Sequence, residues 1–161
     1  MKILIIYYSL NGNTKLIADN IAYALNADLL ELKDNKPAKS NLLTKYIYGT
    51  KEILFNKSPQ LLPFEINVFD YDILFIGTPV WAGNYAPILN TFLKSHILLN
   101  NKIAFFACCT LNKGKAFKNL KKNLSGNTFL GEKLFFNPRK INTKKNSLSA
   151  REWAREIIAK I

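Results

Sequence analysis

The chain has 161 residues, of which 48% are hydrophobic, and its 23 Lys and Arg against 11 Asp and Glu give a formal net charge of +12. This length suits one domain, and the apolar content excludes a largely disordered chain. The charge leaves two interpretations open: a solvated basic surface, or a surface that meets an acidic partner such as nucleic acid, an anionic membrane or an acidic redox protein.

Targeting and redox signals predict a cytoplasmic protein. The apolar run over residues 3–8 is too short for the core of a signal peptide, and no segment approaches the roughly 20 apolar residues that span a bilayer. The two cysteines, Cys108 and Cys109, are neighbours without metal-ligand spacing, which favours a reducing compartment. At the end of an apolar run they are expected to act as small hydrophobes, with a redox-active pair as the alternative.

Short apolar runs that fit buried strands alternate with helical patterns along the chain. The first half predicts a strand over residues 2–8, a helix over 13–26, a strand over 28–33, a helix or two short turns over 41–55, and a proline-containing loop over 58–63. The second half predicts a strand over residues 71–77, a loop over 78–85, a helix over 86–95, a strand over 102–109, a helix over 113–124, a strand over 128–136 and a helix over 147–161. Gly131 indicates a bulge or an insertion in the last strand.

Five strands that alternate with helices, without a repeat or a linker, predict a single α/β domain over residues 1–161. We expect a doubly wound, five-stranded parallel sheet of order 2-1-3-4-5 with helices on both faces. Such sheets bind ligands beyond the carboxyl ends of their strands, where the strand order reverses. This rule directs attention to the loops after the first, third and fourth strands.

The first of these loops leaves a buried strand and enters a helix, and it consists of Ser9, Leu10, Asn11, Gly12, Asn13 and Thr14. Its backbone N–H groups can surround an oxyanion, and the helix N-terminus adds a partial positive charge. Because the loop holds no Lys or Arg, a phosphate there would be bound by dipoles and hydrogen bonds alone. The alternative is a plain turn with a capped helix. The loop lacks the lysine of a Walker motif and the three glycines of a dinucleotide site.

Residues 5–18, IIYYSLNGNTKLIA, resemble the N-terminal signature of the flavodoxin family, in which this loop holds the phosphate of flavin mononucleotide (FMN). Asn11 stands where many flavodoxins have threonine, and its amide can also bind a phosphate. The resemblance implies a flavodoxin-like fold, FMN as the cofactor, and cofactor contacts from all six residues of the loop.

The resemblance also assigns the two other loops to the flavin ring. Thr78, Pro79, Val80, Trp81, Ala82 and Gly83 occupy the first flanking loop, where the indole can stack on the ring and the peptide between Ala82 and Gly83 would face flavin N5. Cys109, Thr110, Leu111, Asn112 and Gly114 occupy the second, whose backbone would bind the pyrimidine end. Many flavodoxins have a second aromatic there and this sequence has none, so either Leu111 covers that face of the flavin or the face is open.

Three functions follow from these features. The leading one is an FMN electron carrier of flavodoxin type, in which the flavin brings the redox chemistry and no side chain is catalytic. The second is an NAD(P)H-dependent flavin or quinone reductase of the same fold, favoured by an open flavin face and by the segment before residue 63. The third is a basic nucleic-acid-binding module, which the charge supports but the lack of a stacking platform does not. We expect redox proteins as partners, acidic ones among them, and a monomer.

Overall fold

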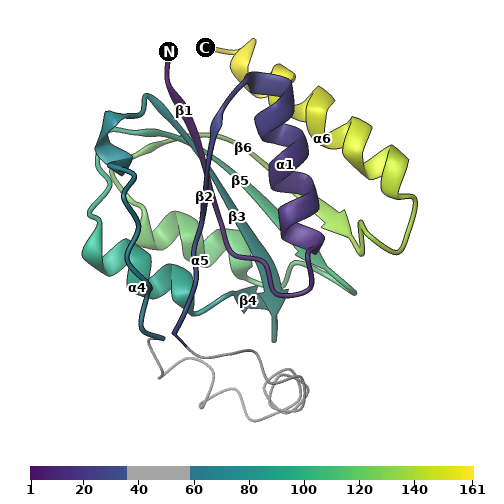
Figure 1. Cartoon of the computed structure of the whole chain (residues 1–161), viewed down its shortest axis with the longest axis horizontal. Coiled ribbons are helices and arrows are strands. Elements are labelled where there is room, and N and C mark those ends of the chain that lie inside the picture. Colours follow the sequence, from purple (N-terminus) through teal and green to yellow (C-terminus); the bar gives the residue numbers. More distant parts are fainter. Residues whose placement is uncertain (36–58) are drawn as a thin grey trace.

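The computed structural model of the chain describes residues 1–35 and 59–161 (Figure 1). The helix or turns expected over residues 41–55 lie outside the described residues. Parallel strands form the centre of the molecule in the order β2 (Asp28–Glu31), β1 (Ile3–Tyr7), β3 (Ile73–Trp81), β5 (Lys102–Cys109) and β6 (Thr128–Phe136). The expected fold and the order of its five parallel strands are therefore confirmed. A further short strand, β4 (Asn84–Tyr85), pairs with β3.

Helices cover both faces of the sheet (Figure 1). On one face lie α1 (Asn13–Leu25) and α6 (Thr143–Ile158), which pack against each other, and on the other lie α4 (Ile88–Ser95) and α5 (Ala116–Asn123). A single turn of 3-10 helix, η1 (Val68–Asp70), precedes β3. Helix α6 begins at Thr143, four residues before the predicted start. Its first turn is exposed and polar, so it has no apolar residues at helical spacing from which the start could be predicted. No described helix has the length and apolar character needed to cross a membrane.

Burial on both faces explains the continuous apolar runs of the central strands. All five residues of β1 are buried. Leu4 and Ile6 join the core under α4 and α5, whereas Ile3, Ile5 and Tyr7 join the core under α1 and α6. A strand with two apolar faces cannot show alternation, which is why β1, β3 and β5 read as unbroken hydrophobic segments.

The bulge expected near Gly131 is present. Ile103 of β5 pairs with Phe129, but the next residue, Ala104, pairs with Gly131, so β6 contains one extra residue. A Cβ on Gly131 would lie 2.7 Å from Cδ1 of Ile157, so the glycine lets α6 pack close to the sheet. The predicted position of the bulge is therefore confirmed, and the close packing of α6 is the reason that the structure adds.

The expected loop over residues 78–85 is wrong, because the strand continues through it as a hairpin. Strand β3 extends to Trp81 and pairs with β4, with Trp81 opposite Asn84. Ala82 and Gly83 form the two-residue turn with φ values of 47° and 75°, as a type I′ turn requires. The buried Thr78 hydroxyl accepts a hydrogen bond from the Ala86 N–H at 2.9 Å, which holds the chain at the base of the hairpin.

Candidate functional site

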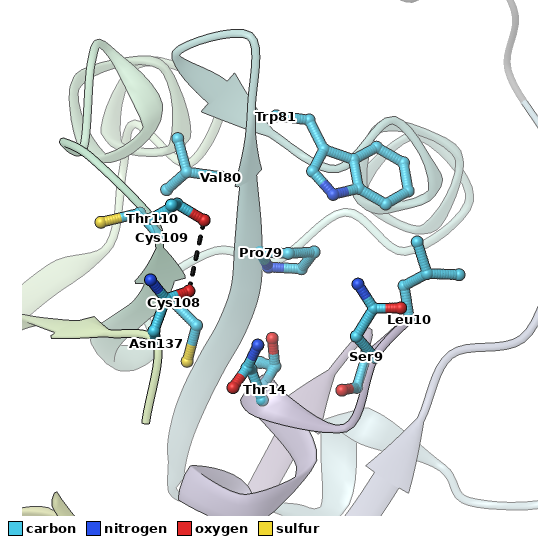
Figure 2. Close-up of a pocket in the computed structure, with 12 residues that line it drawn as sticks. Ser9, Leu10, Thr14, Pro79, Val80, Trp81, Cys108, Cys109, Thr110 and Asn137 are labelled. Atoms are coloured by element: carbon cyan, nitrogen blue, oxygen red, sulfur yellow. Dashed lines mark hydrogen bonds between the residues drawn. The ribbon is translucent and has the colours of Figure 1, made fainter. Parts of the chain in front are cut away.

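A pocket lies at the carboxyl ends of β1, β3 and β5, where the rule for doubly wound sheets places a ligand (Figure 2). It contains about 560 Å³ of space, a volume that includes its open mouth. All three loops singled out in the sequence contribute to it. Its lining residues are Ser9, Leu10, Asn11, Asn13, Thr14, Pro79, Val80, Trp81, Cys108, Cys109, Thr110 and Asn137.

The first loop presents unpaired hydrogen-bond donors to this pocket. Gly12, with φ of 75°, is the N-cap of α1 and provides no side chain to cap it. Within the part of the chain that the structure describes, the N–H groups of residues 10–14 donate no hydrogen bond, whereas the Lys15 N–H donates to Ser9 Oγ at 3.1 Å and the Leu16 N–H to Gly12 O at 3.0 Å. These free N–H groups sit at the positive end of the helix dipole.

Thr14 adds an unpartnered hydroxyl to the same place. Its side chain is only 1% exposed, and Oγ1 has no hydrogen-bond partner among the described residues. Burial raises the pKa of the neighbouring Cys108 thiol to about 12. The Thr14 hydroxyl lies close enough to lower that pKa slightly, but the two groups do not meet in the geometry of a hydrogen bond. A buried polar atom without a partner costs free energy, so its presence indicates a ligand that completes the site.

The second loop places an aromatic ring at the edge of the pocket. Figure 2 shows Trp81 and Leu10 on one side, with Thr110 and the two cysteines across from them and Pro79 between. The ring of Tyr8 packs edge-on against the indole, with centroids 5.7 Å apart, and so fixes its position. Among the described lining residues, Trp81 is the single aromatic one. Thr78, Ala82 and Gly83 do not line the pocket; they build the hairpin that carries Trp81.

The third loop contributes its first residues and is held by contacts that the sequence did not reveal. Thr110 lines the pocket and its hydroxyl bonds to Asn137 Oδ1 at 3.2 Å (Figure 2). Asn137 follows β6, whose end is not among the three loops predicted to form the site. Because β6 pairs with β5, it ends at the same edge of the sheet. Leu111 is 82% exposed and does not line the pocket, so it leaves the cavity uncovered.

A close backbone contact joins the second loop to the third. The Lys115 N–H donates to Gly83 O at 2.6 Å, and a Cβ on Gly114 would lie only 2.3 Å from that oxygen. Asn112 accepts a hydrogen bond from the Gly114 N–H at 2.9 Å, which shapes the same turn. Asn112 and Gly114 therefore hold the two loops together without lining the pocket.

The two cysteines, and the single histidine of the sequence, His96, pack against neighbouring side chains or lie buried in the core. His96 ends α4 and stacks on Phe92, with centroids 4.7 Å apart, and it is not among the described pocket residues. Cys108 and Cys109 are free and buried, and burial raises the pKa of both thiols. Since the thiolate is the reactive form, this environment favours the interpretation as small hydrophobes.

The family model described as Flavodoxin matches residues 2–155. The chain belongs to the flavodoxin family. Membership confirms the resemblance seen in residues 5–18 and supports the expected cofactor, FMN. A comparison with curated proteins gives no match.

Solved structures show the same flavodoxin fold. A candidate flavoprotein from Bacteroides eggerthii DSM 20697 is 24% identical, with a TM-score of 0.77 over 98% of each chain. A flavoprotein from Lactobacillus acidophilus NCFM, determined in complex with FMN, is 24% identical, with a TM-score of 0.66 over 88% of this chain and 97% of that one. Flavodoxin 2 from Bacillus cereus is 20% identical, with a TM-score of 0.63 over 100% of both chains.

The described residues fit the cofactor of this family. The free N–H groups of residues 10–14 and the orphaned Thr14 hydroxyl are suited to a phosphate. Trp81, Pro79 and Val80 offer apolar surface to a flat ring, and Thr110 and Asn137 offer polar atoms at the other side. Which of these atoms contact FMN stays a prediction.

Proposed function

We propose that this flavodoxin binds FMN in the described pocket and serves as an electron carrier. The observation that carries the proposal is the buried, unpartnered Thr14 hydroxyl beside a row of unpaired N–H groups, in a pocket that also holds Trp81. A site of hydrogen-bond donors next to an aromatic face suits a ligand with an anionic end and a flat ring. When bound, FMN supplies the redox chemistry.

The chemical character of the pocket favours a carrier over an enzyme with its own acid or base. Among the described lining residues there is no Asp, Glu, Lys, Arg or His. The titratable groups present are Cys108 and Cys109, whose pKa values are raised by burial. The described lining residues are suited to bind and orient a cofactor, and none of them is ready to move a proton near neutral pH.

A reductase that takes hydride from a nicotinamide is the second candidate, and the exposure of Leu111 favours it. That side chain is exposed and does not line the cavity, and the third loop offers no aromatic residue in its place. A flavin with one uncovered face has room for a nicotinamide or a quinone above it. Basic residues at the edge of the third loop, Lys115 and Lys118, are exposed and could meet an acidic redox partner in either case.

The test begins with the colour and absorption of the purified protein. We expect a yellow protein from which heat releases FMN, identified by chromatography with mass detection, and an apoprotein that binds added FMN in a one-to-one ratio. Recovery of FAD, or an apoprotein that does not bind FMN, would contradict the proposal. Incubation with NADH or NADPH and a quinone then separates the two candidates, because a carrier does not oxidise the nicotinamide at a catalytic rate.

A further inference from the structure

Arg139 lies against the first loop although it is far away in sequence. It belongs to the turn between β6 and α6, and its backbone N–H donates to Asn13 Oδ1 at 3.0 Å. Its guanidinium Nη1 donates to Asn11 O at 2.5 Å. The side chain also covers Gly12, since a Cβ there would lie 2.8 Å from Nη1 and 3.3 Å from Cζ.

We propose that Arg139 is the positioning residue of this loop and the source of its positive charge, and that it makes the site selective for a ligand that carries a phosphate. The inference rests on the proposed function, because it concerns the FMN phosphate. It changes the expectation drawn from the sequence, in which dipoles and hydrogen bonds alone hold that phosphate.

The positioning role follows from peptide geometry. In a trans peptide the C=O and the following N–H point in opposite directions. The Asn11 carbonyl points to Arg139, so the Gly12 N–H points away from it. Asn11 and Asn13, on either side of Gly12, line the pocket, whereas Arg139 does not; we infer that an N–H that points away from Arg139 faces the pocket side of the loop. The bond from the Arg139 N–H holds the Asn13 side chain in the same way.

Within residues 1–35 and 59–161, the first loop has few positive charges around it. The described pocket residues include no cation, and Lys15, the cation at the start of α1, bonds to Asp19 at 2.9 Å. Among the described cationic side chains, Arg139 is the one whose charged group is hydrogen-bonded to the loop. A guanidinium stays charged across the working pH range, so the loop holds a constant positive charge beside the place of the phosphate.

The experiment separates charge from general support of the fold. Apoproteins of the wild type, Arg139→Gln and Arg139→Lys are titrated with FMN and with riboflavin, which lacks the phosphate, and quenching of flavin fluorescence gives both dissociation constants. The matched control is Lys140→Gln, which removes the same charge from the next residue. We expect Arg139→Gln to weaken FMN binding about ten-fold, as loss of one charge-assisted contact does, and riboflavin binding less than two-fold. Arg139→Lys should restore part of the loss, and Lys140→Gln should change little.

A pH series adds a readout that a structural role would not move. A phosphate monoester gains its second charge near pH 6. The ratio of FMN to riboflavin affinity should therefore differ more between wild type and Arg139→Gln at pH 7.5 than at pH 5. Three outcomes would overturn the inference while FMN binding by the wild type stands: Arg139→Gln weakens both ligands equally, it leaves FMN affinity unchanged, or the wild type and the variant differ in the FMN-to-riboflavin affinity ratio by the same factor at both pH values. If the wild type itself prefers riboflavin or binds neither flavin, the proposed function fails as well.

Discussion

Replacing Thr14 by valine tests the phosphate site with two effects of opposite sign. Valine keeps the branched shape of threonine and removes the hydroxyl whose oxygen is buried without a partner. An unsatisfied buried polar group costs about 1–3 kcal/mol, so the apoprotein of Thr14→Val should be more stable by roughly 1 kcal/mol. For a chain of 161 residues that corresponds to a rise in Tm of about 2–4 °C.

The same change should weaken FMN binding. A hydrogen bond to a charged acceptor contributes about 1.5–3 kcal/mol, so the dissociation constant should rise roughly 10- to 150-fold. Riboflavin, which lacks the phosphate, should bind the variant and the wild type about equally. Titration of the apoproteins with both flavins, together with thermal unfolding followed by circular dichroism, measures all three quantities.

Thr110→Val is the matched control. Thr110 also lines the pocket, but its hydroxyl already bonds to Asn137, whereas the Thr14 hydroxyl has no partner among the described residues. Its loss should leave the ratio of FMN to riboflavin affinity unchanged. The reasoning is refuted if Thr14→Val destabilises the apoprotein and weakens both flavins equally, because Thr14 would then support the fold. An unchanged FMN affinity would show that the phosphate does not meet this hydroxyl.

Three further predictions concern the ring, the surface charge and stability. FMN should quench the fluorescence of Trp81 in a Trp153→Phe background, and unchanged emission would contradict stacking on the flavin. Replacing Lys115 and Lys118 by glutamate should lower the flavin's second-electron potential by tens of millivolts. It should also slow electron transfer to an acidic partner, mostly at low salt, and the same replacement of lysines in α6 is the control. Burial raises the pKa of Glu132, but hydrogen bonds from two lysines outweigh it and lower the pKa overall. Glu132→Gln should therefore cost stability at pH 7. In unfolding titrations its deficit should shrink as the pH falls below the ordinary pKa of Glu, about 4.3, and vanish once the pH passes the lowered pKa of the folded carboxylate.

The sequence predicts the sheet and the three loops because their signals are local. Each central strand is an unbroken apolar run, and the order of strands and helices leaves few topologies. The bulge near Gly131 can be predicted because a glycine inside a strand often marks a bulge or a close approach of another segment. The β3–β4 hairpin was missed because its second strand has only two residues, too few for any periodic signal.

Contacts between distant segments could not be predicted in the same way. Asn137 and Arg139 reach the site because β6 lies beside β5, so the turn after β6 comes to the same edge of the sheet as the first loop. Nothing in the residues around Arg139 marks it as part of a phosphate site. The topology placed that turn near the pocket, but only the register of β6, which includes the bulge, decides which residue reaches the loop.

The distribution of charge brings these observations together. A net charge of +12 could be taken to mean a basic pocket, yet the described lining residues are uncharged. Glu132 binds Lys113 and Lys121 at 3.1 and 2.8 Å, so part of the positive charge near the third loop is already paired. A unit charge about 10 Å away in water contributes only roughly 0.4 kcal/mol before screening, and at 0.1 M salt the Debye length is also about 10 Å. Most of the lysines therefore act weakly on the pocket and more strongly on an approaching partner. Arg139 contacts the first loop directly, and under our proposal it acts on the ligand through that loop.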